Sequence, residues 1–145
     1  MNTEIVSAEI HDLAGVFGLL QQNEMPASDL ISSRVRLWVA KNKGAVVGCI
    51  GLEIYHEDGF LRSLAVEKDF QNQGLATRLI DELFSFAKSQ GINKMHLLTI
   101  TAELYFQKRN FIKLNRSEAP DHIQQNSQFT VLCSSTAVYM AKSMG

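Results

Sequence analysis

The sequence predicts a mixed α/β (α+β) fold, a mostly antiparallel sheet with one parallel pair of strands. One observation is that three β-rich runs within residues 34–66 follow one another through short turns, which makes neighbouring strands antiparallel. The other is that the last of these runs continues through a short polar loop into a long amphipathic helix and then a new apolar run. A strand–helix–strand unit crosses over right-handedly and places its two strands parallel.

The expected elements follow in chain order. Strands are expected over residues 4–6, 34–41, 45–55, 60–66, 94–99, 112–116 and 136–142. Helices are expected over residues 9–22, 74–89 and 102–109. Ser7 and Thr101 are the expected N-caps of the first and third helices, and Gly91 and Asn110 are expected to end the second and third. The first helix is expected to bury one face, made of Ile10, Leu13, Ala14, Phe17 and Leu20.

The turn at residues 56–59 decides which side chains meet across the central hairpin. If His56 lies opposite Gly59, then Glu53 lies directly across from Arg62 on the same face. A turn centred on Asp58 and Gly59 breaks that pairing. We favour the first register.

Composition indicates one globular domain over residues 1–145. Of the residues, 46% are hydrophobic and 20% are charged, and the net charge is −1. No basic run is present, so neither nucleic acid nor an anionic membrane is expected as a partner. The N-terminal residues hold no basic segment followed by an apolar run, so export is not expected, and no apolar stretch is long enough to span a bilayer. Cys49 and Cys133 lie in hydrophobic contexts without metal-ligand spacing, so we expect them reduced, in a cytoplasmic protein without a bound metal.

The stretch from Phe60 to Ala76 predicts an anion site. A strand leads through a glycine-bearing loop to the start of the long helix. The first turn of a helix carries backbone N–H groups without intrahelical partners, and the helix dipole adds positive charge there, so a phosphate binds without a cationic side chain. Gly74 and Ala76 let a diphosphate approach these amides closely. The loop has neither the Walker Gly-Lys-Ser/Thr ending nor the three-glycine dinucleotide pattern.

The loop resembles the acetyl-CoA signature of the GNAT family of N-acetyltransferases. That signature is Gln/Arg-x-x-Gly-x-Gly/Ala after a strand that ends in a Leu-Ala-Val-like triplet. Here it reads Gln71-Asn72-Gln73-Gly74-Leu75-Ala76, preceded by Leu64-Ala65-Val66. Asn72 stands where many members carry an extra glycine. The order of elements is also similar to the family fold, which implies a central parallel pair splayed at the CoA site and helices on both faces.

Beyond Leu97 the chain looks most like the arsenic-resistance-associated branch of the family. The shared features are LLTITAELYFQKRNF followed by Arg116, Pro120, Ile123, Phe129, Leu132-Cys133 and Ala137. Two departures concern that branch's substrate: Gln128 replaces the acid before Phe129, and Ser134 replaces the proline after Cys133.

The resemblance implies acetyl-CoA as cosubstrate and assigns its site. The backbone N–H of Leu64 would stabilise the oxyanion and Val66 would bond the pantetheine arm. Amide donors to the diphosphate are expected from Gln71, Gln73, Gly74 and Ala76. The remaining residues expected to contact CoA are Ala65, Asn72, Leu75 and Phe106. In this family the loop after the first helix lines the acceptor site, so residues 25–33 are expected to help choose the substrate.

Glu53 and Arg62 allow three interpretations. Glu53 is the one carboxylate inside a strand expected to border the acceptor pocket, so it is the candidate base that takes a proton from the ammonium group. Alternatively, Glu53 and Arg62 form a structural cross-strand ion pair. In the third interpretation, Arg62 binds a substrate carboxylate, which suits guanidinium geometry. For His96 and His11 a structural or solvent-facing role is expected.

The position that usually supplies the acid departs from the family. Many members have a Tyr four residues before the Gly of Gly-Phe, and here that position is Phe106. Tyr105 is adjacent but about a hundred degrees around the helix. Thiolate release is then left to water, Thr101 or a shifted Tyr105. Arg116 and the loop 120–129 either close over the acceptor or form a surface loop.

The function expected from the resemblance is acetyl transfer from acetyl-CoA to the primary amine of a small molecule, an amino acid or amino-acid-like compound. Two alternatives stay open. One is a domain that binds acyl-CoA without turnover, as a sensor or partner subunit. The other is an enzyme that acetylates a peptide or protein. The family also implies homodimerisation.

Overall fold

The computed structural model describes residues 3–30, 35–126, 128–129 and 136–144. Within these residues one sheet contains the strands β1 (Thr3–Ser7), β2 (Val35–Asn42), β3 (Ala45–Tyr55), β4 (Asp58–Val66), β5 (Lys94–Thr99), β6 (Ile112–Leu114) and β7 (Val138–Ser143). The α-helices are α1 (Leu13–Gln22), α2 (Leu75–Ser89), α3 (Glu103–Gln107) and α4 (Asp121–Gln124). Short 3-10 helices cover Ile10–Asp12, Lys68–Phe70 and Arg116–Glu118.

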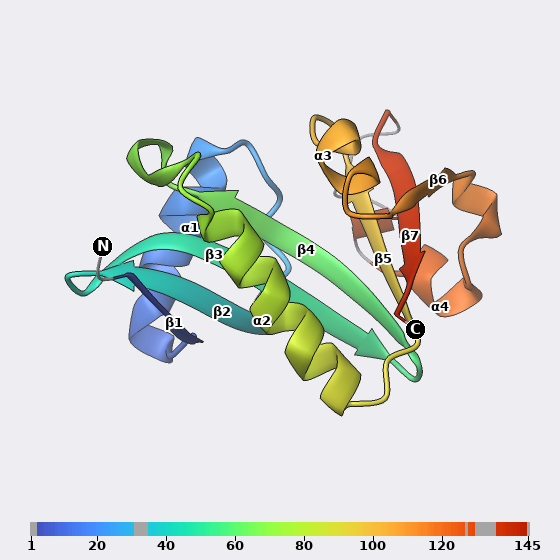
Figure 1. Cartoon of the computed structure of the whole chain (residues 1–145), viewed down its shortest axis with the longest axis horizontal. Coiled ribbons are helices and arrows are strands. Elements are labelled where there is room, and N and C mark those ends of the chain that lie inside the picture. The colour runs from blue at the N-terminus through green and yellow to red at the C-terminus, as the bar shows by residue number, and fades with distance from the viewer. Residues whose placement is uncertain (1–2, 31–34, 127, 130–135, 145) are drawn as a thin grey trace.

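The sheet order is β1-β2-β3-β4-β5-β7-β6, and its pairs are antiparallel except for β4 with β5. This confirms the mixed sheet and its parallel pair. β4 and β5 pair only from Asp58 to Phe60, against residues 94–96. Beyond Phe60 the two strands diverge, and Figure 1 shows the wedge between them. The predicted splay is therefore present.

Helices cover both faces of the sheet. α2 crosses one face, where Leu79 and Leu83 join the large core that contains Ile50 and Leu52 of β3 (Figure 1). α1 lies on the other face, in a second core with Val39 and Cys49. Alternate residues of β3 thus belong to different cores, as the pleat of a strand requires.

The first helix differs from the prediction. Ser7 ends β1 and is not a cap, because the chain first makes the 3-10 turn Ile10–Asp12. Glu9 and Asp12 form the capping box there, and the Glu9 N–H donates to Asp12 Oδ2 at 2.9 Å. A 3-10 turn has about 3.0 residues per turn, so spacing counted from Ile10 is only partly right. Leu20 of the predicted face is buried and Leu13 and Phe17 are half-buried, whereas Ala14 is exposed. Ile10 is 88% exposed, and the buried residues of α1 are Val16, Leu19 and Leu20.

The favoured hairpin register is wrong, and so is the alternative. Tyr55 pairs with Asp58, which leaves a two-residue turn in which His56 has a φ of 58°. Glu53 consequently faces Phe60, and Arg62 faces Gly51. A Cβ on Gly51 would lie 2.9 Å from a methyl of Val35 and 3.4 Å from Arg62 Cγ, so this glycine provides room for the Arg62 side chain.

The second helix agrees with the prediction, and its end at Gly91 is confirmed by a φ of 77°. α3 begins differently. The N-cap of α3 is Ala102 and no side chain caps the helix, so the expected cap at Thr101 is wrong. The Ala102 N–H itself donates to Thr99 Oγ1 at 3.0 Å. α3 ends at Gln107, earlier than predicted, and the turn that follows it closes at Asn110, whose φ of 73° is the expected left-handed stop.

Candidate active site

A cavity of about 840 Å³ opens where β4 and β5 separate. Its strand lining includes Leu64 and Val66 of β4 and Leu97 to Thr99 of β5. The start of α2 closes one end, and residues 23–26 after α1 border it as well. Its volume lies within the range of small-molecule and cofactor sites. It therefore joins the predicted phosphate loop to the predicted acceptor loop, of which residues 31–33 lie outside the described residues.

Leu64 lies beside an irregularity in β4. The β3–β4 register shifts between Cys49 and Gly51, and Ser63 has a φ of 60°. Such a bulge bends the strand and redirects the next residues. Here it occurs at the wall of the cavity, next to the residue expected to offer its N–H to the oxyanion.

The phosphate loop leaves the start of α2 without a capping side chain. Gly74 is the N-cap, no acidic residue lies in the first turn, and the first intrahelical bond runs from Arg78 N–H to Gly74 O at 3.1 Å. Gly74, Leu75, Ala76 and Thr77 all line the cavity. The first turn of the helix therefore lies at the cavity wall with N–H groups that have no intrahelical partners, as a phosphate site requires. Gln73, also expected to donate, is not among the lining residues.

Backbone geometry explains two residues of the signature. Gly74 has a φ of 79°, and an added Cβ would meet no atom within 4 Å. The glycine is thus required for its left-handed backbone and leaves open space in front of the helix. Asn72 also has a positive φ of 63°, and Asn is a residue that tolerates this conformation. Its presence in place of a glycine keeps the loop shape. Gln71 Nε2 fixes the loop by donating to Val66 O at 3.0 Å.

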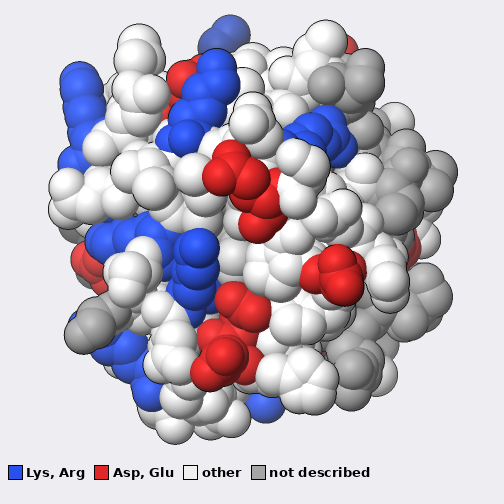
Figure 2. Space-filling view, turned by 90° about the vertical axis from the view of Figure 1, so that its right-hand side faces the viewer, with Lys and Arg blue, Asp and Glu red and all other residues white. Residues whose placement is uncertain are grey.

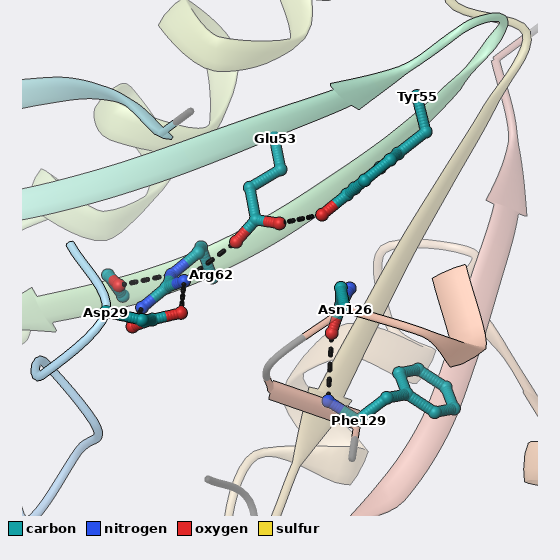
Figure 3. Close-up of polar contacts among 7 residues, drawn as sticks. Asp29, Glu53, Tyr55, Arg62, Asn126 and Phe129 are labelled. Atoms are coloured by element: carbon teal, nitrogen blue, oxygen red, sulfur yellow. Dashed lines mark hydrogen bonds and ion pairs between the residues drawn. The ribbon is translucent and has the colours of Figure 1, made fainter. Parts of the chain in front are cut away.

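Arg62 is held by two carboxylates. Its Nη1 donates to Asp29 Oδ2 at 2.5 Å and to Glu53 Oε2 at 2.7 Å, and its Nη2 donates to Asp29 Oδ1 at 2.6 Å (Figure 3). The Arg62 side chain is fully buried. Burial alone would lower the pKa of Arg62, but the two carboxylates outweigh it and raise the pKa. A substrate carboxylate could bind this guanidinium in bidentate fashion only after displacing Asp29.

Glu53 uses both carboxylate oxygens. Oε2 accepts from Arg62, and Oε1 accepts a hydrogen bond from the Tyr55 hydroxyl (Figure 3). The ion pair considered from the sequence thus forms, although across a diagonal rather than between facing residues. Sequence reasoning missed Asp29 and Tyr55. Asp29 is 33 positions from Arg62, and no local pattern signals such a contact.

α3 presents an apolar side chain where many family members have a phenol. Phe106 is buried and Tyr105 is 36% exposed, and both line the cavity. Their rings meet edge to face at 5.2 Å between centroids. The Arg109 guanidinium lies 5.1 Å from the centre of the Tyr105 ring.

Arg116 is not among the residues that line the cavity. Its Nη2 donates to Phe129 O at 3.1 Å, and its guanidinium lies 5.3 Å from the centre of the Phe129 ring. These contacts hold the segment that follows α4, which brings Gln128 to the cavity wall. Within the same segment, the Phe129 N–H donates to Asn126 Oδ1 at 2.9 Å (Figure 3).

A second buried network lies at the hairpin end of β4. Asp58 accepts from His96 Nε2 at 2.8 Å and from His122 Nε2 at 2.7 Å, and His96 Nδ1 lies 2.7 Å from the Tyr139 hydroxyl. Burial lowers the pKa of His96, so its neutral ring donates to Asp58 and accepts from Tyr139. Burial would raise the pKa of Asp58, but bonds from His96 and His122 lower it. The expected structural role of His96 agrees with these contacts, and His122 anchors α4.

This network predicts acid lability. The His96 pKa is lower in the fold than its unfolded value of about 6.5, so protonation below that pH favours the unfolded chain. The pKa of Asp58 is also lowered, so its contribution is present above its unfolded value of about 3.9 and is lost as pH falls through the folded pKa. We expect the melting temperature, followed by circular dichroism, to fall as the pH drops below about 6.5, because of His96, and to fall further below about pH 4, because of Asp58. A His96→Gln variant should flatten the upper part of this dependence, and a flat parent profile between pH 7 and pH 5 would contradict the assignment.

Two features are absent from the described residues. None of their helices is long and apolar enough to cross a membrane. No group of three or more His, Cys, Asp or Glu side chains in the same residues is placed to hold a metal ion. Cys49 is a buried free thiol, and burial raises its pKa to about 12. Cys133 lies outside the described residues.

Comparison with known proteins gives consistent matches. The model of the acetyltransferase (GNAT) family matches residues 8–114. A probable N-acetyltransferase, camello, of Xenopus tropicalis is 26% identical over 131 residues, which cover 86% of this chain and 60% of that protein. An amino-acid acetyltransferase of Vibrio atlanticus is 24% identical over 126 residues, 81% of this chain and 28% of that protein. The chain thus spans less than two thirds of either relative.

A solved structure agrees on the fold. The N-acetylglutamate synthase of Neisseria gonorrhoeae, in complex with coenzyme A and N-acetyl-glutamate, superposes with a TM-score of 0.82 at 18% identity. The match covers all of this chain and 36% of the synthase chain.

Proposed function

The chain belongs to the acetyltransferase (GNAT) family, and we propose that it transfers an acetyl group from acetyl-CoA to the primary amine of a small molecule. The observation that carries the proposal is the continuity of the cavity. It runs from the uncapped N-terminus of α2, past the bulged segment of β4, to the loop after α1. A thioester between the splayed strands would therefore have a diphosphate site on one side and an acceptor space on the other.

We assign the steps of the reaction as follows. The amine, once neutral, attacks the thioester carbonyl, the carbonyl oxygen becomes an oxyanion, and the carbon–sulfur bond breaks to release CoA as a thiolate that must be protonated. The Leu64 N–H stabilises the oxyanion, and Val66 bonds the pantetheine arm. Ala65, also expected to contact CoA, lies in the core on the α1 face and is not among the residues that line the cavity. Glu53 is the proposed base. It is buried and is not among the residues that line the cavity, so the proton of the ammonium group would reach it through water. Tyr105 or water supplies the proton to the thiolate.

The proposed acceptor is an amino acid or an amino-acid-like compound. The amino-acid acetyltransferases among the relatives support this class. The tail motif around Arg116 supports the arsenic-resistance-associated branch, whose members would extend the class to amino-acid analogues. Because Asp29 and Glu53 occupy the Arg62 guanidinium, we propose Arg62 as the residue that positions the acceptor wall, and Arg116 as the residue that holds the segment carrying Gln128.

The same proposal places the reaction in the cytoplasm, on one domain over residues 1–145. It includes a homodimer formed through the last strands. β6 is an edge strand, and its Ile112 is 60% exposed.

A second candidate function is acyl-CoA binding without turnover. It is favoured by Phe106, which has no acidic proton to donate to the thiolate, at the position where many family members have a Tyr. A peptide or protein acceptor is the remaining alternative, and it would need an acceptor end open enough for a chain.

The deciding experiment measures release of free CoA thiol from acetyl-CoA against a panel of amines, with CoA binding followed in parallel by calorimetry. The panel holds amino acids, phosphinic and arsenical amino-acid analogues, polyamines and short peptides, and a reaction without amine corrects for hydrolysis. We expect turnover on an amino acid or analogue. Turnover only on peptides would select the peptide enzyme, and CoA binding without turnover would select the non-catalytic domain. Absence of CoA binding would overturn the site itself.

A further inference from the structure

A second groove, of about 470 Å³, lies beside α3. Its lining residues are Tyr105, Lys108, Arg109, Asn110 and Lys142. Three of these five carry a positive charge. Tyr105 also lines the main cavity, so the two spaces adjoin along α3. The groove is therefore a cationic extension of the proposed CoA site.

The three cations are available to an anion. Across the described part of the chain, no Asp or Glu forms an ion pair with Lys108, Arg109 or Lys142; the nearby pair on this side joins Lys113 to Glu103, at 3.9 Å. Figure 2 shows the face seen from the right-hand side of Figure 1, where Lys and Arg side chains gather mainly on the left half of the view and Asp and Glu side chains lie among them. Like charges that share a groove repel one another, and a bound anion relieves that repulsion.

Two of the cations are held in place by aromatic rings. Lys142 Nζ lies 5.3 Å from the centre of the Phe84 ring, and the Arg109 guanidinium lies 5.1 Å from that of Tyr105. Contacts of this kind restrict a long side chain before any ligand arrives. The ordering cost of binding an anion is correspondingly lower.

One hydrogen bond connects a residue of the groove to the start of α2, where the diphosphate is proposed to bind. Arg109 Nη2 donates to Thr77 Oγ1 at 2.5 Å, and Thr77 lies in the first turn of α2, whose amides face the main cavity. CoA carries a third phosphate beyond its diphosphate, a monoester on the ribose 3′ position. That group bears close to two negative charges at neutral pH.

We propose that the groove beside α3 binds a phosphate monoester, the 3′-phosphate of CoA, and that Lys108, Arg109 and Lys142 make the protein select CoA over dephospho-CoA. The inference rests on the proposed function, because it takes the diphosphate to lie at the start of α2. It adds a specificity-determining site at the end of α3 and on β7. Lys108 is exposed and Lys142 half-buried, so the interaction is expected to be sensitive to salt.

The test compares CoA with dephospho-CoA by calorimetry, in the parent protein and in a Lys108→Ala/Lys142→Ala variant. Arg109 is left intact because it also contacts Thr77. We expect the parent to bind CoA about tenfold more tightly than dephospho-CoA, the size of one charge-assisted contact on a partly exposed surface. The variant should lose most of that preference while its affinity for dephospho-CoA stays unchanged. Raising the salt concentration should shrink the parent's preference in the same way.

Lys113→Ala is the matched control. Lys113 lies on β6 on the same side of the molecule, and its side chain is 58% exposed and paired with Glu103, so its removal should leave the preference intact. Equal affinities of the parent for CoA and dephospho-CoA would overturn the inference. An equal loss for both ligands in the double variant would also overturn it, because that result indicates general attraction and not a 3′-phosphate site. If the parent binds neither ligand, the proposed function itself has failed.

Discussion

A Gly74→Glu variant is expected to lose measurable CoA binding, with affinity reduced more than a hundredfold. Gly74 has a φ of 79° and lies at the mouth of the uncapped α2 N-terminus. A glutamate there places a carboxylate where the diphosphate would lie, so repulsion and bulk act together. The left-handed backbone adds strain for any residue with a Cβ, about 1 to 2 kcal/mol. Calorimetric titration with CoA measures the loss.

The control for backbone strain lies at the other end of the same helix. Gly91 has a φ of 77°, and an added Cβ there would also meet no atom within 4 Å. Gly91→Glu should therefore cost similar stability and leave CoA affinity unchanged. If both variants lose CoA binding equally, destabilisation explains the loss. If Gly74→Glu binds CoA like the parent, the start of α2 is not the diphosphate site.

The sheet and the phosphate loop could be predicted because their signals are local. Apolar spacing fixed α2, and the strand–helix–strand order fixed the parallel β4–β5 pair. Gly91 and Asn110 were recognisable as helix stops because few residues tolerate a positive φ. These features depend on neighbours within a few positions of the chain.

The register and the acceptor wall could not be predicted because they depend on distant contacts. The hairpin turn was misplaced because Asp58 and Gly59 look like turn residues, yet both lie in β4 and His56 takes the positive φ. Asp58 instead meets His96 and His122, which are 38 and 64 positions away. Glu53 and Arg62 still meet, since positions two apart on a strand share a face and a long guanidinium spans the diagonal.

An Arg62→Ala substitution is expected to lower the free energy of unfolding by about 3 to 5 kcal/mol, which is the usual cost of removing one partner from a buried ion pair. Arg62 is the cation between Asp29 and Glu53, whose side chains are 8% and 5% exposed. Chemical denaturation measures the loss. An effect of this size would raise the Michaelis constant for any acceptor through misfolding, so kinetics of this variant alone do not identify a substrate carboxylate site. The control is Arg36→Ala, an exposed arginine that lies over the Phe86 ring, with an expected cost of about 1 kcal/mol or less.

A Glu53→Gln variant separates the two roles of this cluster. The amide oxygen can still accept from Arg62, and Asp29 still balances the guanidinium charge, so little stability should be lost. If Glu53 is the base, kcat should fall by about 10² to 10⁴ while CoA affinity stays unchanged. An unchanged kcat would show that Glu53 is only an ion-pair partner and that solvent accepts the proton of the ammonium group.

For Arg62→Ala, a variant as stable as its parent would contradict the proposal that the buried cluster supports the acceptor wall. Two buried carboxylates this close together require a cation between them.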